Sequence, residues 1–131
     1  MEIKAVFDGG LKVKAKFDEF EVPSDHAVKN GGDNSAPDPF SIFLSSIINC
    51  AGFFVLKFCQ SREIPTDGIS LNLVNDFNPK ERRAENIKIT VNVPESFPKK
   101  YEKALIKAVD QCSVKKTILA QPNFEVTTQV V

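Results

Sequence analysis

The fold of this chain is decided by one stretch of sequence, Asp38-Pro39-Phe40-Ser41-Ile42-Phe43-Leu44-Ser45-Ser46-Ile47-Ile48-Asn49-Cys50-Ala51-Gly52-Phe53-Phe54-Val55-Leu56. Asp38 is a suitable N-cap and Pro39 suits the first helical position, so the stretch predicts a helix that ends near Arg62. No residue from Phe40 to Leu56 is charged, and apolar side chains cover every face of the predicted helix. A helix that is apolar all round is buried in protein or in a membrane.

A membrane span is the first alternative for this helix. Its charge-free run reaches the lower end of the roughly 17–25 residues that cross a bilayer. Four polar residues interrupt the run, however, and no belt of Trp or Tyr flanks it; the four are Ser41, Ser45, Ser46 and Asn49. We therefore expect no membrane and a central helix wrapped by the rest of the fold or by a second copy. A chain of 131 residues has difficulty covering such a helix alone, which favours a homodimer.

The segments around the helix alternate between apolar and polar residues, as half-buried strands do. Residues 11–17 are the clearest case, because three lysines lie on the face opposite four apolar residues. Similar patterns predict strands at 2–7, 20–22, 69–77, 87–93 and 124–131, a loop at 23–37, and helices that begin at Pro98 and Ser113. The predicted order β-β-β-α-β-β-α-α-β is an α+β pattern with largely antiparallel neighbours, in a single domain of residues 1–131.

Composition excludes several classes of function. Seventeen basic and seventeen acidic residues cancel, whereas nucleic-acid binders usually carry a basic excess, so we expect no nucleic-acid partner. The N-terminus lacks the pattern of a signal peptide, which favours a cytoplasmic location. His26 is the only histidine, and neither a Cys-x-x-Cys pair nor a glycine-rich loop after a strand is present. We therefore expect neither a metal nor another cofactor.

The three cysteines are an odd number, so they cannot all pair within the chain. Cys50 and Cys59 lie nine residues apart in the predicted helix, which separates them by about 13 Å along its axis. A disulfide needs Cα atoms within about 7 Å, so Cys59 is predicted to pack in the core. Cys112 precedes the predicted cap Ser113, where backbone N–H groups and the helix dipole favour a thiolate. An inert core residue is the alternative for any of these thiols.

Two motifs resemble those of the OsmC/Ohr family. The first is the stretch from Ala36 to Cys50, in which the cysteine follows Pro39 by eleven positions. The second is Cys112-Ser113-Val114-Lys115-Lys116-Thr117-Ile118-Leu119, which is similar to the family's Cys-Pro/Ser-Val-x-x-Thr-Leu pattern. The order of the predicted elements also resembles the family, so the resemblance covers essentially the whole chain.

The resemblance implies an intertwined homodimer with antiparallel sheets around long buried central helices, and active sites at the subunit interface. It also implies reduction of organic hydroperoxides in oxidative stress defence, by a cycle of two cysteines. Cys50 would be the peroxidatic thiolate, Cys112 the resolving thiol, and an external dithiol the reductant. The residues that would line the pocket are Phe40, Ser46, Asn49 and Phe53.

The chain departs from the family's hydroperoxide reductases at two positions. Those proteins have a Glu ten residues before the first cysteine and an Arg from the N-terminal region. Here the first position is Phe40, and no Arg precedes Arg62. Without a cation, a cysteine in an apolar helix is expected to have a raised pKa. The alternative function is therefore a non-peroxidase relative that binds a small apolar ligand, or responds to redox state, at the dimer interface.

Overall fold

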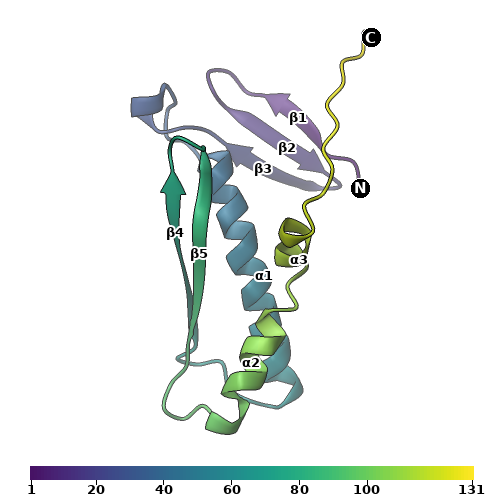
Figure 1. The fold of residues 1–131 in the computed structure, drawn as a ribbon. Coiled ribbons are helices and arrows are strands. Elements are labelled where there is room, and N and C mark those ends of the chain that lie inside the picture. Colours follow the sequence, from purple (N-terminus) through teal and green to yellow (C-terminus); the bar gives the residue numbers. More distant parts are fainter. The chain divides into compact units, whose positions relative to one another are not determined.

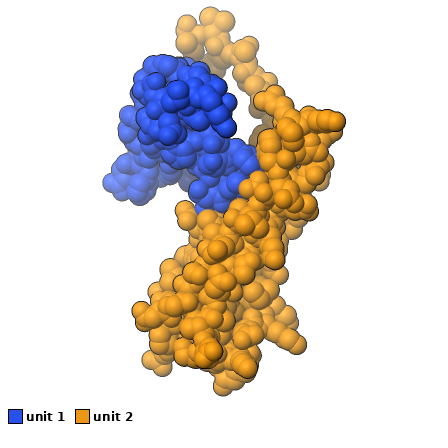
Figure 2. Space-filling view, turned by 90° about the vertical axis from the view of Figure 1, so that its left-hand side faces the viewer, with its two compact units in different colours: residues 1–45 blue, residues 46–131 orange.

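A computed structural model describes residues 1–131 and divides them into two compact units, residues 1–45 and residues 46–131 (Figure 2). The first unit holds a three-stranded antiparallel sheet in the order β1-β2-β3 (Figure 1). Its strands are β1 (Lys4–Phe7), β2 (Val13–Phe17) and β3 (Phe20–Ser24). The alternation along 11–17 thus marks a strand, as predicted. Its lysines form cross-strand ion pairs, Lys14 with Glu21 at 3.2 Å and Lys16 with Glu21 at 2.8 Å.

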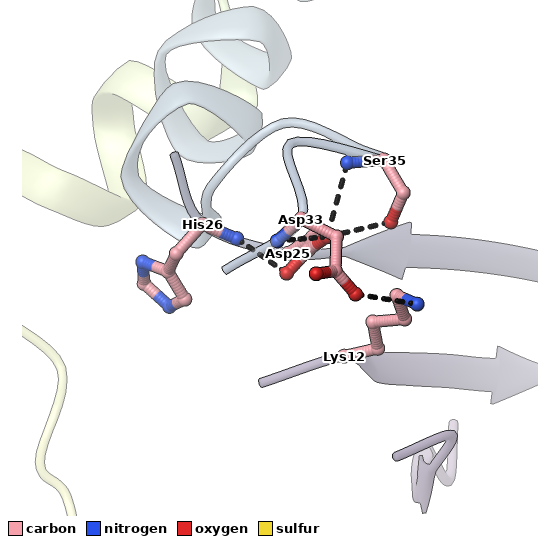
Figure 3. A network of polar contacts seen from close by, with 5 residues as sticks. All are labelled: Lys12, Asp25, His26, Asp33 and Ser35. Atoms are coloured by element: carbon pink, nitrogen blue, oxygen red, sulfur yellow. Dashed lines mark hydrogen bonds and ion pairs between the residues drawn. The ribbon is translucent and has the colours of Figure 1, made fainter. Parts of the chain in front are cut away.

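The loop after β3 is wound around one buried carboxylate (Figure 3). Asp25 is 0% exposed and accepts hydrogen bonds from the hydroxyl of Ser35 at 2.6 Å and from the backbone N–H of Ser35 at 3.0 Å. The N–H groups of His26 and Asp33 donate to it as well, at 2.8 and 3.3 Å. These donors, Ser35 foremost, hold the pKa of Asp25 far below its ordinary value of 3.8. The connection at 23–37 is therefore an ordered loop, and it includes the 3₁₀ turn η1 (Val28–Asn30).

Helix α1 (Pro39–Ser61) begins where the sequence predicts. The carboxylate of Asp38 accepts a hydrogen bond from the N–H of Ser41 at 3.0 Å and another from the Ser41 hydroxyl at 2.8 Å. These two bonds lower the pKa of Asp38, and the first of them gives a partner to one of the backbone N–H groups at the helix start. At the other end, the guanidinium of Arg62 stacks on the ring of Phe58 at 3.7 Å and donates to the carbonyl of Phe58 at 3.3 Å.

By length and composition alone, α1 could cross a membrane, because an 18-residue window has a mean hydropathy of 1.9. The core helix of a soluble protein meets the same two conditions. Within the chain only 28% of that window is buried. The chain therefore covers one stripe of α1 and leaves other apolar side chains open, including Phe53 and Leu56.

The second unit packs the C-terminal half of α1 against a hairpin and a short helix (Figure 1). The hairpin consists of β4 (Ser70–Asn78) and β5 (Arg83–Asn92), with Leu71 opposite Val91 and Leu73 opposite Ile89. A 3₁₀ turn, η2 (Lys99–Tyr101), leads into α2 (Glu102–Val109), and α3 (Ser113–Leu119) follows. The buried core residues of this unit come from α1, α2 and the turn before α2; they are Ala51, Val55, Phe58, Cys59, Phe97, Leu105 and Val109.

The predicted closing strand at 124–131 is wrong for the single chain. The structure has no strand there, and Phe124, Val126 and Val130 are at least 90% exposed. The alternation of apolar residues is real, but a strand forms only where another strand accepts and donates its backbone hydrogen bonds. No strand of this chain pairs with the segment, which continues beyond α3 as extended chain (Figure 1).

Candidate functional site: a pair of thiols on two helices

The second unit brings together two cysteines that are 62 residues apart in sequence. Cys50 lies in the middle of α1, and Cys112 is the N-cap residue of α3. Their side chains share a hydrogen bond, and all three cysteines are free thiols. Cys59 is 0% exposed within the core of the same unit, and burial raises its pKa. The prediction that Cys59 packs in the core is therefore confirmed.

The surroundings of Cys50 favour its thiolate. Burial raises the pKa of Cys50, but hydrogen bonds from the thiol of Cys112, from the N–H groups of Val114 and Ser113, and from the Ser113 hydroxyl together bring it below its ordinary value of 9.0. None of these donors is a charged side chain. The expectation that Cys50 has a raised pKa is therefore wrong, because the start of α3 supplies hydrogen bonds to its sulfur.

The surroundings of Cys112 favour the protonated thiol. Burial raises its pKa, and the hydrogen bond with Cys50 raises it further. The N–H groups of Lys115 and Val114 act in the opposite direction but do not outweigh these effects. The expectation that the helix start makes Cys112 a thiolate is thus wrong. The thiol of Cys112 donates a hydrogen bond to the sulfur of Cys50, so of the two cysteines Cys50 is the one whose thiolate is favoured.

The turn between α2 and α3 holds Cys112 in place. Its N–H donates to the carbonyl of Val109 at 3.2 Å, and its carbonyl accepts from the N–H of Lys116 at 3.0 Å. Two side-chain hydrogen bonds span the same turn. The ammonium group of Lys115 donates to the carboxylate of Asp110 at 2.6 Å, and that of Lys116 donates to the amide oxygen of Gln111 at 3.0 Å. The predicted cap at Ser113 is displaced by one residue, since Cys112 occupies the N-cap position and no side chain caps the helix.

A cavity of about 330 Å³ lies beside Cys112 within the second unit. Aliphatic side chains make up nearly all of its wall: Ile47, Ala51, Ile87, Ile89, Val91, Ile106, Val109, Ile118 and Leu119. The only charged residues of the wall are Asp110 and Lys115, which pair with each other at 2.6 Å. The cavity therefore suits an uncharged hydrocarbon group, and ligand pockets of this volume are ordinary.

The residues that were predicted to line a pocket with Cys50 do not gather around this cavity. Asn49 and Phe53 line a separate groove on α1, together with Gly52 and Leu56. Phe40 lies ten residues before Cys50 on α1, and its ring contacts that of Phe43 at 5.7 Å. Ser46 is exposed.

Sequence reasoning missed Ser113 and Val114 as donors to Cys50. The only signal for them was the predicted start of a helix at this point. No three metal-ligating side chains come together in the structure.

The fold and the site define a small α+β protein in which a cysteine on a long apolar helix shares a hydrogen bond with a buried cysteine at the start of another helix. The chain belongs to the OsmC-like protein family, because the model of that family matches residues 32–127. No curated protein sequence matches the chain.

Solved structures share the fold at low sequence identity. An osmotic stress induced and detoxification response protein from Psychrobacter arcticus superposes with a TM-score of 0.75 at 20% identity, over 88% of this chain and 85% of that one. An OsmC-like protein from Mycoplasma pneumoniae gives 0.73 at 18% identity, over 92% and 87%. An organic hydroperoxide resistance protein from Legionella pneumophila gives 0.53 at 15% identity, over 90% and 89%. At these identities the likeness concerns the fold alone.

Proposed function

We propose that this chain is a thiol-dependent reductase of organic hydroperoxides in oxidative stress defence, with Cys50 as the peroxidatic and Cys112 as the resolving cysteine. The observation that carries the proposal is the hydrogen-bonded pair in which the pKa of Cys50 is lowered and that of Cys112 is raised. Peroxides are attacked by thiolates, and a neighbouring thiol protects the product from further oxidation. Cys50 is therefore suited to attack the peroxide, and Cys112 is suited to react with the oxidised Cys50.

The cycle begins when the Cys50 thiolate attacks the distal oxygen of the hydroperoxide. The O–O bond breaks, the alcohol leaves with a proton, and Cys50 becomes a sulfenic acid. The thiol of Cys112 then attacks the sulfur of Cys50, which forms a disulfide and releases water. An external dithiol finally supplies two electrons and two protons, and both thiols are restored.

We further propose that the working unit is a homodimer in the cytoplasm. Three free thiols suit a reducing compartment. Phe53 and Leu56 on the open side of α1 are 53% and 47% exposed, and large exposed apolar patches usually mark an interface. The unpaired alternation at 124–131 also suits addition to a sheet of a second copy.

Peptide mapping tests the chemistry directly. The protein is treated with less than one equivalent of tert-butyl hydroperoxide for seconds and then alkylated and digested. A disulfide between Cys50 and Cys112 is the expected product, whereas slow and equal oxidation of all three cysteines would refute the proposal. In the Cys112→Ser variant the sulfenic acid of Cys50 should persist and be trapped by dimedone. Cys59→Ala is the matched control, since its loss should leave the disulfide unchanged.

The second candidate function is binding of a small apolar ligand, and the aliphatic cavity beside Cys112 favours it. A binding protein would take up a neutral hydrocarbon alcohol such as 2-phenyl-2-propanol without oxidation of either cysteine. The two candidates are separated by the same peptide map, because only the reductase forms the disulfide within seconds.

A further inference from the structure

We propose that the reductant attacks the sulfur of Cys50, so that the mixed disulfide forms on Cys50 and Cys112 is the first thiol to be released. This inference rests on the proposed function, since it takes the Cys50–Cys112 disulfide as the oxidised state. Either sulfur of a disulfide can accept the incoming thiolate, and the choice depends on access and on the leaving thiol.

Access favours Cys50. Cys112 is 2% exposed in the single chain, and the turn from Val109 to Lys116 fixes its backbone on both sides. Cys50 is only partly buried on α1. A second copy of the chain can remove exposed surface but cannot uncover a residue that its own chain buries. Cys112 therefore stays enclosed in a monomer and in any dimer.

The cavity beside Cys112 does not offer the reductant another route. Its wall is aliphatic, and the attacking species is a thiolate anion, which loses its hydration on entering an apolar space. Lys115 is the only cation of the wall, and it is already paired with Asp110 at 2.6 Å. No free positive charge is thus available to draw the anion toward Cys112.

The leaving group favours the opposite choice, so the two effects compete. Attack on Cys112 would expel Cys50, whose lowered pKa makes it the better leaving thiol. The acidity of the leaving thiol affects the rate of exchange only after the reductant has reached the sulfur, whereas burial keeps the reductant from reaching Cys112. We therefore expect access to decide the first step. The acidity of Cys50 acts in the second step, when Cys50 itself must leave.

Two thiol–disulfide exchange steps transfer two electrons from the dithiol to the Cys50–Cys112 disulfide. The first thiolate of the reductant bonds to the sulfur of Cys50, the Cys50–Cys112 bond breaks, and Cys112 leaves as a thiolate that takes up a proton. The second thiolate of the reductant then attacks the reductant's own bound sulfur. Cys50 leaves as a thiolate, and the dithiol departs as its disulfide.

Trypsin separates the three cysteines, which makes the regiochemistry measurable. Cleavage after Lys and Arg places Cys50 in peptide 30–57, Cys59 in peptide 58–62 and Cys112 in peptide 108–115. The full chain is oxidised with diamide, which needs no peroxidase activity. It is then treated briefly with a monothiol, N-acetylcysteine, and quenched with N-ethylmaleimide.

The expected result is N-acetylcysteine on peptide 30–57 and maleimide on peptide 108–115, in an excess of about tenfold over the reverse pattern. The reverse pattern, or an equal mixture, would overturn the inference and leave the proposed function standing. Failure of diamide to form the Cys50–Cys112 disulfide would overturn both. If the disulfide forms with diamide but not with peroxide, the proposed function fails and the adduct pattern still decides the inference.

Urea provides the control for burial. The same oxidised protein is treated in a concentration of urea that unfolds it, where both sulfurs are equally accessible. The preference for Cys50 should then disappear. A preference that persists in urea would show that the sequence next to each cysteine decides the site of attack, and it would overturn the argument from access.

Discussion

Gly32→Ala should destabilise the first unit, because the loop around Asp25 leaves no room for a methyl group at this position. A Cβ on Gly32 would lie 2.0 Å from the carbonyl oxygen and 2.6 Å from the carbonyl carbon of His26. Ordinary van der Waals contact begins at 3.4 Å. The two backbone segments must therefore separate by about 1.4 Å, and neither can move aside as a flexible side chain would.

The magnitude follows from the hydrogen bonds that such a movement breaks. The carbonyl of His26 accepts from the N–H of Asn34 at 2.9 Å, and the N–H of Gly32 donates to Ala27 at 3.2 Å. At about 1 kcal/mol for each backbone bond, the loss is about 2 kcal/mol. For a chain of this length that corresponds to a fall of about 8 °C in Tm.

Thermal and urea unfolding followed by circular dichroism measure this loss, and hydrogen exchange over residues 25–37 locates it. Gly52→Ala is the matched control, because the same methyl group meets no atom within 4 Å on α1. Alanine is also the better helix former by about 1 kcal/mol, so this variant should be slightly more stable. A Gly32→Ala variant within about 0.5 kcal/mol of the parent protein would refute the close packing of the loop. Destabilisation by Gly52→Ala would instead show that a second chain packs against this face of α1.

Three further predictions concern charge, the thiols and assembly. The depressed pKa of Asp25 means that its carboxylate contributes its full stability above the ordinary value of 3.8 and loses it as the pH falls further; acid titration of Asp25→Asn should lack this dependence. Ser113→Ala should raise the pKa of Cys50 and slow its alkylation by iodoacetamide at pH 7 about threefold, with Ser113→Thr restoring the rate; an unchanged pH profile would contradict the assignment. Phe53→Glu should leave the folded chain intact but convert a dimer to a monomer in size-exclusion chromatography with light scattering, as should removal of residues 122–131; a parent protein of monomer mass would refute the dimer.

Local signals in the sequence were sufficient for most of the fold. Asp38 and Pro39 mark the start of α1 because capping is a matter of adjacent residues. The alternation along β2, β4 and β5 marks strands because their partners follow within the same chain. The alternation at 124–131 is equally regular, yet no strand forms there. Alternation of apolar and polar residues indicates that a segment is suited to a sheet. It does not predict whether another strand is available to pair with that segment.

The loop around Asp25 had no comparable signal. Its acceptor and its donors are up to ten residues apart, at Asp25 and Ser35, and none occupies a position of a periodic pattern. Gly31 and Gly32 lie within the predicted loop at 23–37, and the sequence pattern gives no specific reason for them. The structure shows a more specific reason for Gly32, which is the carbonyl of His26 within 2.0 Å of an added Cβ. A buried carboxylate of this kind is recognised only when the chain has closed around it, since three of its four hydrogen bonds come from backbone N–H groups.

The assignment of acidity to the two thiols shows why sequence neighbours mislead at such a site. Cys112 stands directly before α3, so local reasoning gives the benefit of the helix start to Cys112. The N–H groups of the helix start act on both sulfurs, because those of Ser113 and Val114 donate to Cys50 and those of Val114 and Lys115 act on Cys112. For Cys112, burial and the hydrogen bond with Cys50 outweigh these N–H groups, and both raise its pKa. The helix that begins at Cys112 thus favours the thiolate of Cys50. A variant that shifts α3 should for that reason weaken both halves of the pair at once, the acidity of Cys50 and the proton donation from Cys112.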